Sequence, residues 1–332
     1  MKRLIFLLSV LSVAAPIALA QNHLQESMHH PGQMHHVMSG AKLTVTNDPS
    51  GQAWIIRVGP VNLPAHADHM AVAQPPDLFI AAQMDGWLTA FHPRLVDDTG
   101  KPLPNKLLHH VAFWNTSRQD FLCPNKEEHI FGAGSEMNDW PAVPGFGYRV
   151  QPADRIRVST MFANPTDTSY PKVYLEVREE YQLAQPGAAP LRSVYPVWFD
   201  VMGCHNSGYT LAPGKNVTTG NFTLGYSGLL LGVGGHLHDY GQQLVLEDAT
   251  RGQVIVTLDS KLDAAGRILS MPTDSFAGSG GYRLDKGEAV RVTATYDNST
   301  GRHIPEGAMG IVVGYFLPDD PKQLSALARR PK

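Results

Sequence analysis

Cysteine and charge are both scarce in this chain of 332 residues. It has two cysteines, Cys123 and Cys204, so neither a disulfide framework nor a CxxC redox motif is present. Because the two lie far apart in the sequence, we expect them to remain unpaired, although an exported protein would allow a disulfide. Charged residues make up 17% of the chain, the formal net charge is −3, and no basic block occurs. We therefore expect neither nucleic acid nor an anionic membrane surface as a partner.

Long apolar runs are confined to the N-terminus. Lys2 and Arg3 precede an apolar core that ends at Ala20, which is typical of a secretory signal peptide cleaved before Gln21. No later stretch is apolar over the roughly 20 residues that a membrane-spanning helix needs. These features predict a mature protein without a membrane span that is secreted or periplasmic.

A helical period is absent as well. Glycine (31) and proline (25) are abundant, and short alternating or apolar runs lie between turn signals such as residues 47–51. Residues 141–148 are interpreted as a loop. The clearest strand-like runs are residues 42–46, 53–58, 77–83, 87–92, 107–115, 155–162, 173–181, 254–258 and 289–296. This pattern predicts an all-β fold.

The chain is long enough for two domains, and its best linker candidate is the Pro/Gly/Ala-rich stretch 183–190. The predicted parts are a signal peptide (1–20), a disordered His/Met-rich tract (21–40), an N-terminal β-domain (41–182), a linker (183–192), a C-terminal β-domain (193–320) and a polar, frayed tail (321–332).

The His/Met-rich tract has a composition suited to copper. Residues 28–38 contain four histidines and three methionines and show no apolar period. Imidazole and thioether together suit copper better than hard cations. Copper capture is one interpretation, and a flexible tail that binds metals adventitiously is the other.

Two histidines alternate at the end of an apolar run. His236 and His238 follow residues 229–233 and precede the alternating run 243–248, a pattern typical of a β-strand. Residues i and i+2 share one face of a strand, so both imidazoles would lie on one surface. Neutral imidazole is a good ligand for copper, zinc or iron, so the pair is a candidate metal site. Two ordinary surface or core histidines are the alternative.

A second pair, His109 and His110, lies within the apolar run 107–115. Neighbouring residues on an ideal strand face opposite ways, so one ion can bind both only if the strand bends locally or the rings use different nitrogens. One buried and one exposed histidine would be the alternative. We favour metal ligation, because burying two histidines without partners is costly. His66 and His69 lie in a loop and are interpreted as surface residues.

The order of these motifs resembles a known family. The paired histidines, a strand that ends in Asn164-Pro165, a linker, the His-x-His and a late methionine before a Gly-Tyr-Phe strand span residues 87 to 316. This order is similar to that of the copper type II, ascorbate-dependent monooxygenases, which include the peptidylglycine α-hydroxylating and dopamine β-monooxygenases. The resemblance implies two antiparallel β-sandwich (jelly-roll) domains that face each other across a cleft, each with one copper.

The same resemblance implies the ligands. His109 and His110 match the first copper site, and Phe91-His92-Pro93 is similar to a motif that the family keeps upstream of that pair. His236 and His238 match the second site, and Met309 matches its methionine ligand. Because thioether is a soft ligand that favours Cu(I), we expect His236, His238 and Met309 to be the catalytic set that meets O2. The first site would store and pass on a second electron.

One departure concerns the first copper site. Met161 stands where the family has the third histidine of this site. Methionine can bind Cu(I) but holds Cu(II) less well. His92 or His129 could substitute for the missing ligand.

Another departure concerns the substrate. Peptide-processing members hold a substrate carboxylate with an arginine at the position of Gly234, and they also use an asparagine and a tyrosine at the positions of Ile311 and Val313. A peptidylglycine substrate is therefore not expected.

These inferences predict a secreted copper monooxygenase that hydroxylates an unactivated C–H bond of a small substrate with O2 and a reductant such as ascorbate. Asp239 or Tyr240 could orient the imidazoles, or could serve only in a turn and in packing. A non-catalytic copper-binding or buffering protein of the envelope is the alternative. A cupin is disfavoured because Gln242 and Gln243 stand where its glutamate is needed, and the methionine argues against zinc hydrolysis.

Overall fold

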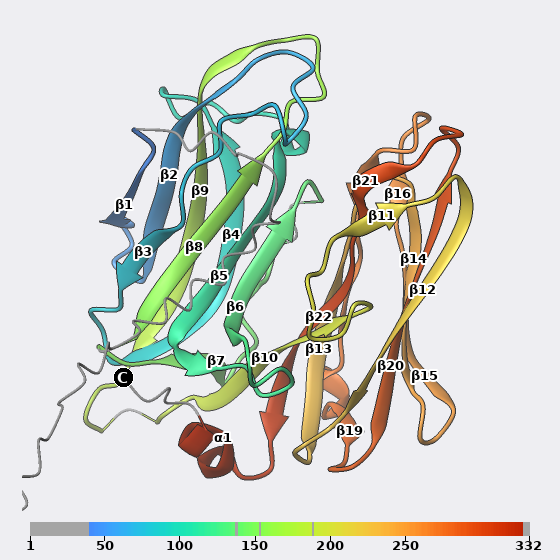
Figure 1. Cartoon of the computed structure of the whole chain (residues 1–332). Helices are drawn as coiled ribbons and strands as arrows, with labels where there is room; N and C mark the ends of the chain where they lie inside the picture. The colour runs from blue at the N-terminus through green and yellow to red at the C-terminus, as the bar shows by residue number, and fades with distance from the viewer. Residues whose placement is uncertain (1–39, 137–138, 153, 188, 328–332) are drawn as a thin grey trace, which may run out of the picture. The chain divides into compact units, whose positions relative to one another are not determined.

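The computed structural model describes residues 40–136, 139–152, 154–187 and 189–327. The expected signal peptide and all of the expected His/Met-rich tract except Gly40 lie outside these residues. The described residues belong to one compact unit. Regular structure in them is almost entirely strand, so the expected all-β class is confirmed (Figure 1).

The largest sheet has ten strands and contains segments from most of the described chain. Its neighbours along the sheet are β1 (Lys42–Asn47), β2 (Ala53–Leu63), β9 (Tyr170–Leu183), β4 (Gly86–Val96), β7 (Phe146–Val150), β10 (Arg192–Asp200), β22 (Gly310–Pro318), β13 (Gly228–Leu237) and β18 (Thr273–Ser275), with β19 (Tyr282–Leu284) also paired to β13. The stretch expected to be a loop at 141–148 therefore contains the start of strand β7. Its Pro- and Gly-rich composition concealed a short strand that is held mainly by its neighbours.

Two four-stranded sheets complete the main architecture. The first contains β3 (Leu78–Ala81), β8 (Arg155–Phe162), β5 (Leu108–Gln119) and β6 (Glu127–Gly134), and the second contains β12 (Gly214–Thr223), β20 (Ala289–Asn298), β14 (Gly241–Asp248) and β15 (Gln253–Asp259). Smaller elements are the pairs β11 (Tyr209–Leu211) with β21 (Ile304–Ala308) and β16 (Lys261–Leu262) with β17 (Ile268–Ser270), and the single-turn helices η1 (Asn105–Leu107) and η2 (Ala277–Ser279).

Alternation of buried and exposed positions along the strands produces two hydrophobic cores. The alternation is clear in β8 and β20, where every second side chain is buried. The first core lies between the first four-stranded sheet and β2, β4 and β9, and the second lies between the other four-stranded sheet and β10, β13 and β22. Sheets stacked on a shared core form a sandwich arrangement.

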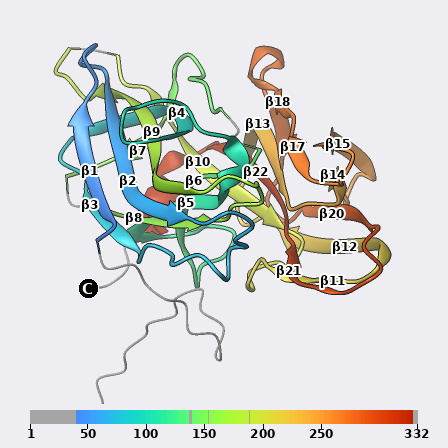
Figure 2. The same ribbon diagram turned by 90° about the horizontal axis from the view of Figure 1, so that it is seen from above.

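The large sheet joins the two cores. Strands β7 and β10 pair in parallel, with Arg192 opposite Phe146, and β10 then pairs antiparallel with β22. In Figure 1, β10 and β22 lie between the group β1–β9 and the group β12–β20, and Figure 2 shows β22 between the same two groups. The expected linker falls between the end of β9 and the start of β10. The division into two β-domains with these boundaries stays a prediction.

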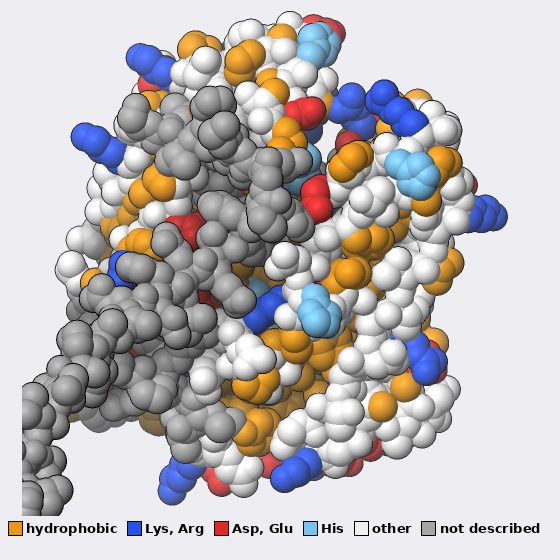
Figure 3. Space-filling model, viewed as in Figure 1, with side chains coloured by type: hydrophobic (Ala, Val, Ile, Leu, Met, Phe, Trp, Pro, Cys, Tyr) orange, Lys and Arg blue, Asp and Glu red, His pale blue; other side chains and the backbone are white. Residues whose placement is uncertain are grey.

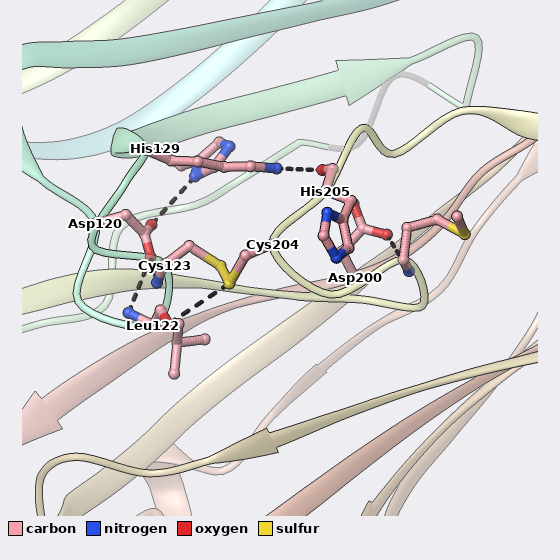
Figure 4. Close-up of a disulfide and its surroundings, with 9 residues drawn as sticks. Asp120, Leu122, Cys123, His129, Asp200, Cys204 and His205 are labelled. Atoms are coloured by element: carbon pink, nitrogen blue, oxygen red, sulfur yellow. Dashed lines mark hydrogen bonds and ion pairs between the residues drawn. A yellow bond between two sulfur atoms is a disulfide. The ribbon is translucent and has the colours of Figure 1, made fainter.

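The two cysteines form a disulfide, so the expectation that they remain unpaired was wrong. Cys123, between β5 and β6, is bonded to Cys204, which follows β10, with their Cα atoms 5.4 Å apart (Figure 4). Separation of 81 residues in sequence did not imply separation in space, because the sheets bring these two loops together. The bond links a loop of the first four-stranded sheet to the part of the chain that forms the second core.

The expected frayed tail begins with a short helix, α1 (Pro321–Leu327). Asp320 Oδ1 accepts the N–H of Lys322 at 3.0 Å, and proline occupies the first helical position, so both features favour a helix start here. Leu324 of this helix is buried in the second core. No helix of the described residues is long and apolar enough to cross a membrane. On the face shown in Figure 3, the described Lys and Arg side chains are scattered rather than gathered into a patch.

Candidate metal centre

Five histidine side chains gather between the two halves of the described chain, that is, the part built around the first core and the part built around the second core. We call His69, His109, His110, His236 and His238 the histidine cluster. His69, which was expected at the surface, is half-buried in the loop between β2 and β3, and its ring stacks on that of His109. The two ring centres are 4.5 Å apart and the planes differ by 3°. A loop histidine carries no local pattern that would have indicated this contact.

A β-bulge places His109 and His110 together. On the ladder between β5 and β8, Leu108 pairs with Phe162 and His110 pairs with Met161, so His109 is an extra residue on β5. This is the local bend that ligation of neighbouring strand residues requires. The ring centres of His109 and His110 are 5.0 Å apart.

His236 lies at the end of β13 and His238 directly follows that strand, so only the first of the two histidines expected on a strand is part of it. Their ring centres are 5.3 Å apart, with an angle of 83° between the planes. The ring of His238 also lies 4.5 Å from that of His109. Histidines from β5 and from the end of β13 therefore meet directly.

Glu136 orients His236, and sequence reasoning missed it. Its Oε1 lies 2.8 Å from His236 Nδ1 and also accepts the backbone N–H of Gly134 at 2.9 Å. Glu136 is buried, and its carboxylate favours a proton on Nδ1 of His236. The lone pair of Nε2 on the same ring is then free to bind a metal ion. The carboxylate is 100 residues away from its histidine in sequence, which explains why no local motif indicated it.

Three imidazole nitrogens of the cluster are buried without a hydrogen-bond partner: His236 Nε2 and both ring nitrogens of His238. Buried polar atoms are normally satisfied, so unpartnered ones in a group are an unusual feature that a ligand would relieve. Nitrogen donors of this kind suit copper, zinc or iron. A methionine ligand, for which Met309 is the expected residue, would favour copper among these.

Burial and mutual repulsion keep most of these rings neutral. Burial, aided by the charges of His238 and His110, holds the pKa of His109 well below its usual range. Burial, with His236 and His110, does the same to the pKa of His238, and burial lowers the pKa of His110 to about 3. For His236, burial also acts to lower the pKa, but the charge and hydrogen bond of Glu136 outweigh it and the pKa is raised. Neutral rings are the form that binds metal.

Tyr296 ties the backbones of two expected ligands together. Its fully buried hydroxyl accepts the N–H of His238 at 3.0 Å and the N–H of Met309 at 3.1 Å, and it donates to the carbonyl of Met309. Met309 lies just before β22, and its half-buried side chain packs against the first core. The structure therefore brings Met309 next to His238, although 71 residues separate them.

The remaining candidates fall into two groups. Met161 is half-buried on β8 and lies opposite His110 in the ladder, so the two side chains share a face of the sheet. His92 instead pairs with Asp139 and Glu180, and His129 pairs with Asp120 and stacks on Trp198. Both proposed substitutes for the third histidine thus have partners outside the histidine cluster.

Asp239 and Tyr240 serve the turn that follows His238. Asp239 Oδ1 accepts the N–H of Ile268 at 3.0 Å, and Tyr240 has a φ of 69° with its ring beside Gly266. These contacts match the structural alternative rather than the orientation of imidazoles.

As the side chains stand, no three histidine, cysteine, aspartate or glutamate residues of the described chain are arranged to hold one metal ion. The rings of the histidine cluster instead pack against one another. Methionine is not one of those four residue types, so a site with a methionine sulfur ligand is not covered by that statement. The unpartnered nitrogens, together with Met309 whose backbone is tied to that of His238 through the Tyr296 hydroxyl, are donors of the type that suits copper.

Comparison with known proteins supports the same metal. No family model matches the chain. It is similar to the "Probable copper-dependent oxygenase M1" of Phoma sp. (strain ATCC 20986 / MF5453) and to the "Probable copper-dependent oxygenase clz3" of Cochliobolus lunatus. Each is 26% identical over a match that covers 63% of this chain, and the match covers 57% of the first relative's length and 72% of the second's. The chain is thus a distant relative of proteins named copper-dependent oxygenases, which supports copper-dependent oxidation as its chemistry.

Proposed function

We propose that this chain is a secreted or periplasmic copper-dependent monooxygenase that hydroxylates an unactivated C–H bond of a small substrate. The observation that carries the proposal is the histidine cluster, which has three buried ring nitrogens without a hydrogen-bond partner and Met309 beside His238, in a chain similar to two proteins named copper-dependent oxygenases. Export is supported by the sequence of residues 1–20 alone.

Copper, when bound, would supply one-electron redox chemistry and reaction with O2. His236, His238 and Met309 would hold the ion, with Glu136 fixing which nitrogen His236 presents. His109 and His110, with Met161 across the ladder, would bind the copper that receives electrons from ascorbate or a similar reductant. The burial of His238 would keep bulk water away from the reacting atoms.

The surroundings of Gly234 argue against a carboxylate-bearing peptide substrate. A Cβ atom at Gly234 would lie 2.9 Å from the ring of Trp140, so an arginine could stand here only if the indole moved. Ile311 and Val313 are buried against the first core. These apolar contacts replace the charged and polar groups that would hold a carboxylate, so we expect a small substrate without such an anchor.

Oxygen consumption tests the proposal. Copper-loaded protein should consume O2 with ascorbate faster when a substrate is present, and His238→Ala should abolish that increment. His303→Ala is a matched control, because His303 is exposed and lies outside the histidine cluster. Equal, substrate-independent O2 consumption by the protein, by His238→Ala and by free copper would contradict the proposal.

A copper-binding or buffering protein is the second candidate. The replacement of the expected third histidine by Met161 favours it, because a first site that holds Cu(II) less well is poorly suited to store and pass on the second electron of a monooxygenase. This candidate predicts tight copper binding that His238→Ala weakens, without any product whose formation depends on O2. A screen of small C–H substrates by mass spectrometry for a gain of one oxygen atom separates the two.

A further inference from the structure

The first expected copper site has two histidines where the resemblance implies three. Met161 stands at the position of the third, and both His92 and His129 are paired with carboxylates outside the histidine cluster. His69 is the one member of the histidine cluster that neither expected site uses. Its ring lies directly against that of His109, a ligand expected for the first site.

A buried glutamine fixes the backbone of His69 against the strand that carries Met161. Gln74 Nε2 donates to the carbonyl of His69 and to the carbonyl of Phe162, each at 2.8 Å. Gln74 Oε1 accepts the N–H of Phe162 at 2.8 Å. Because Phe162 follows Met161 at the end of β8, this side chain holds the loop histidine beside the position where the third ligand is missing.

Asn164 anchors the start of the same loop. Its N–H donates to the carbonyl of Ala67 at 2.6 Å, and its side-chain Nδ2 donates to the carbonyls of Leu63 and Pro64. The side chain of Asn164 is fully buried, as is usual for a polar group whose hydrogen bonds are made within the protein. Two buried amide side chains therefore hold this loop on the end of β8, which is the kind of support that a metal ligand needs.

The ring spacings suit three imidazoles around one ion. A metal–imidazole bond of about 2.0 Å puts each ring centre roughly 3 Å from the ion, so two rings on one ion have centres roughly 4.5 to 6 Å apart. The centres of His69 and His109 are 4.5 Å apart, and those of His109 and His110 are 5.0 Å apart. The planes of His69 and His109 differ by only 3°, so one of these two rings has to turn about its side-chain bonds when both bind the ion.

We propose that His69 is the third nitrogen ligand of the first copper site, beside His109 and His110. This inference rests on the proposed function and keeps one copper in each of the two sites. A third imidazole stabilises Cu(II), which two histidines and the thioether of Met161 hold less well. The first site would then bind its ion in both of the oxidation states that electron transfer requires.

The test counts Cu(II) ions bound to the full chain in air without a reductant. Five histidines near the N-terminus are changed to alanine in a background variant, so that they do not contribute to the count: His23, His29, His30, His35 and His36. Copper per chain is measured by elemental analysis at a free Cu(II) concentration fixed by a chelator. His69→Ala is compared with His66→Asn, a matched control from the same loop, because the exposed ring of His66 pairs with Asp167. Asparagine is used because it tolerates the φ of 58° at this position.

His69→Ala should lose one of the two Cu(II) ions that the background variant binds, whereas His66→Asn should keep both. Because His69 is half-buried, added imidazole can reach the vacated place and should restore the lost ion. Retention of both ions by His69→Ala would overturn the inference, and so would a loss that imidazole does not restore. Circular dichroism identifies a variant that fails to fold, in which case His69→Gln repeats the count with less loss of volume.

Failure of this inference is distinguishable from failure of the proposed function. A background variant that binds no copper would overturn both. A background variant that binds a single Cu(II), which His238→Ala loses and His109→Ala keeps, would overturn the third ligand alone and leave the catalytic site in place.

Discussion

At the scale of single residues, the Glu136 carboxylate sets the orientation of His236. Its Oε1 lies 2.8 Å from Nδ1 of that ring, and its other oxygen is buried without a partner. Glu136→Gln keeps the shape but removes the charge that strengthens the N–H donor. Because such partners typically contribute a 10- to 100-fold effect, we expect copper affinity to fall about tenfold.

Competition with a chelator measures this loss. Glu180→Gln is the matched control, because Glu180 pairs with Arg178 and His92 outside the histidine cluster. Equal affinities for Glu136→Gln and the parent protein would show that the carboxylate does not support a ligand.

The Tyr296 hydroxyl gives a second prediction at the same scale. Tyr296→Phe leaves the buried N–H of His238 and the partly buried N–H of Met309 without their acceptor. Each unsatisfied buried group costs about 1–3 kcal/mol, so we expect the free energy of unfolding to fall by roughly 2–5 kcal/mol. Copper affinity should fall as well, because both backbones lose the group that fixes their spacing.

Tyr148→Phe separates the two effects of that change. Tyr148 is equally buried, but its hydroxyl bonds with Asn115 and Glu128 rather than with the ligands. Denaturant unfolding and copper titration of both variants should show lost stability in each and weaker copper binding in Tyr296→Phe alone. Similar copper affinities in the two variants would show that the Tyr296 hydroxyl does not position His238 and Met309 for copper binding.

At the scale of elements, alternation of apolar residues predicted many strands closely. β8 spans Arg155–Phe162, as expected, and β9 extends the expected run 173–181 to Tyr170–Leu183. The bulge at His109 was foreseen as a condition for ligation, since only a local bend brings adjacent residues together. Local patterns therefore carried most of the fold and four of the five clustered histidines.

Contacts between distant segments were beyond those patterns. His69 reaches His109 from a loop, and Glu136 reaches His236 across 100 residues. Cys123 and Cys204 paired against expectation for the same reason. Periodicity fixes which face a side chain occupies on its own strand, but strand order in the sheets decides which loops meet, and that order has no local signal.

Strand β9 carries a buried acid that makes stability depend on pH. Burial raises the pKa of Glu179 from 4.5 to about 8, and its Oε1 has no hydrogen-bond partner. A carboxyl group with a raised pKa binds its proton more tightly in the folded state. Its contribution to stability is therefore favourable below the unfolded pKa and is lost as the pH rises from about 4.5 to 8.

Glu179→Gln should remove this dependence. We expect the variant to gain roughly 2–5 kcal/mol over the parent protein at pH 9 and little at pH 4. Urea unfolding across this range measures the difference. If the difference in unfolding free energy between the variant and the parent protein were constant at all pH values, the pKa of Glu179 would be the same in the folded and unfolded states.

At the scale of the whole molecule, two devices hold the halves together: the continuous ten-stranded sheet and the Cys123–Cys204 disulfide. The sheet connects the halves through the pairs of β7 with β10 and β10 with β22. The disulfide closes a long loop, and its sequence separation of 81 residues corresponds to about 4.5 kcal/mol of stabilisation, mainly by restricting the unfolded chain.

The sheet and the disulfide should affect stability and copper affinity differently. Removing the disulfide in Cys123→Ala/Cys204→Ala should lower the free energy of unfolding by about 2–5 kcal/mol. Copper affinity should change by less than about threefold, because the sheet and not the disulfide positions β5 against β13, and a threefold change is only about 0.7 kcal/mol. Chemical denaturation and chelator competition on the same samples measure both quantities. If copper affinity fell in parallel with stability, the disulfide rather than the sheet would hold the histidine cluster together, and reduction of that bond would then release the metal.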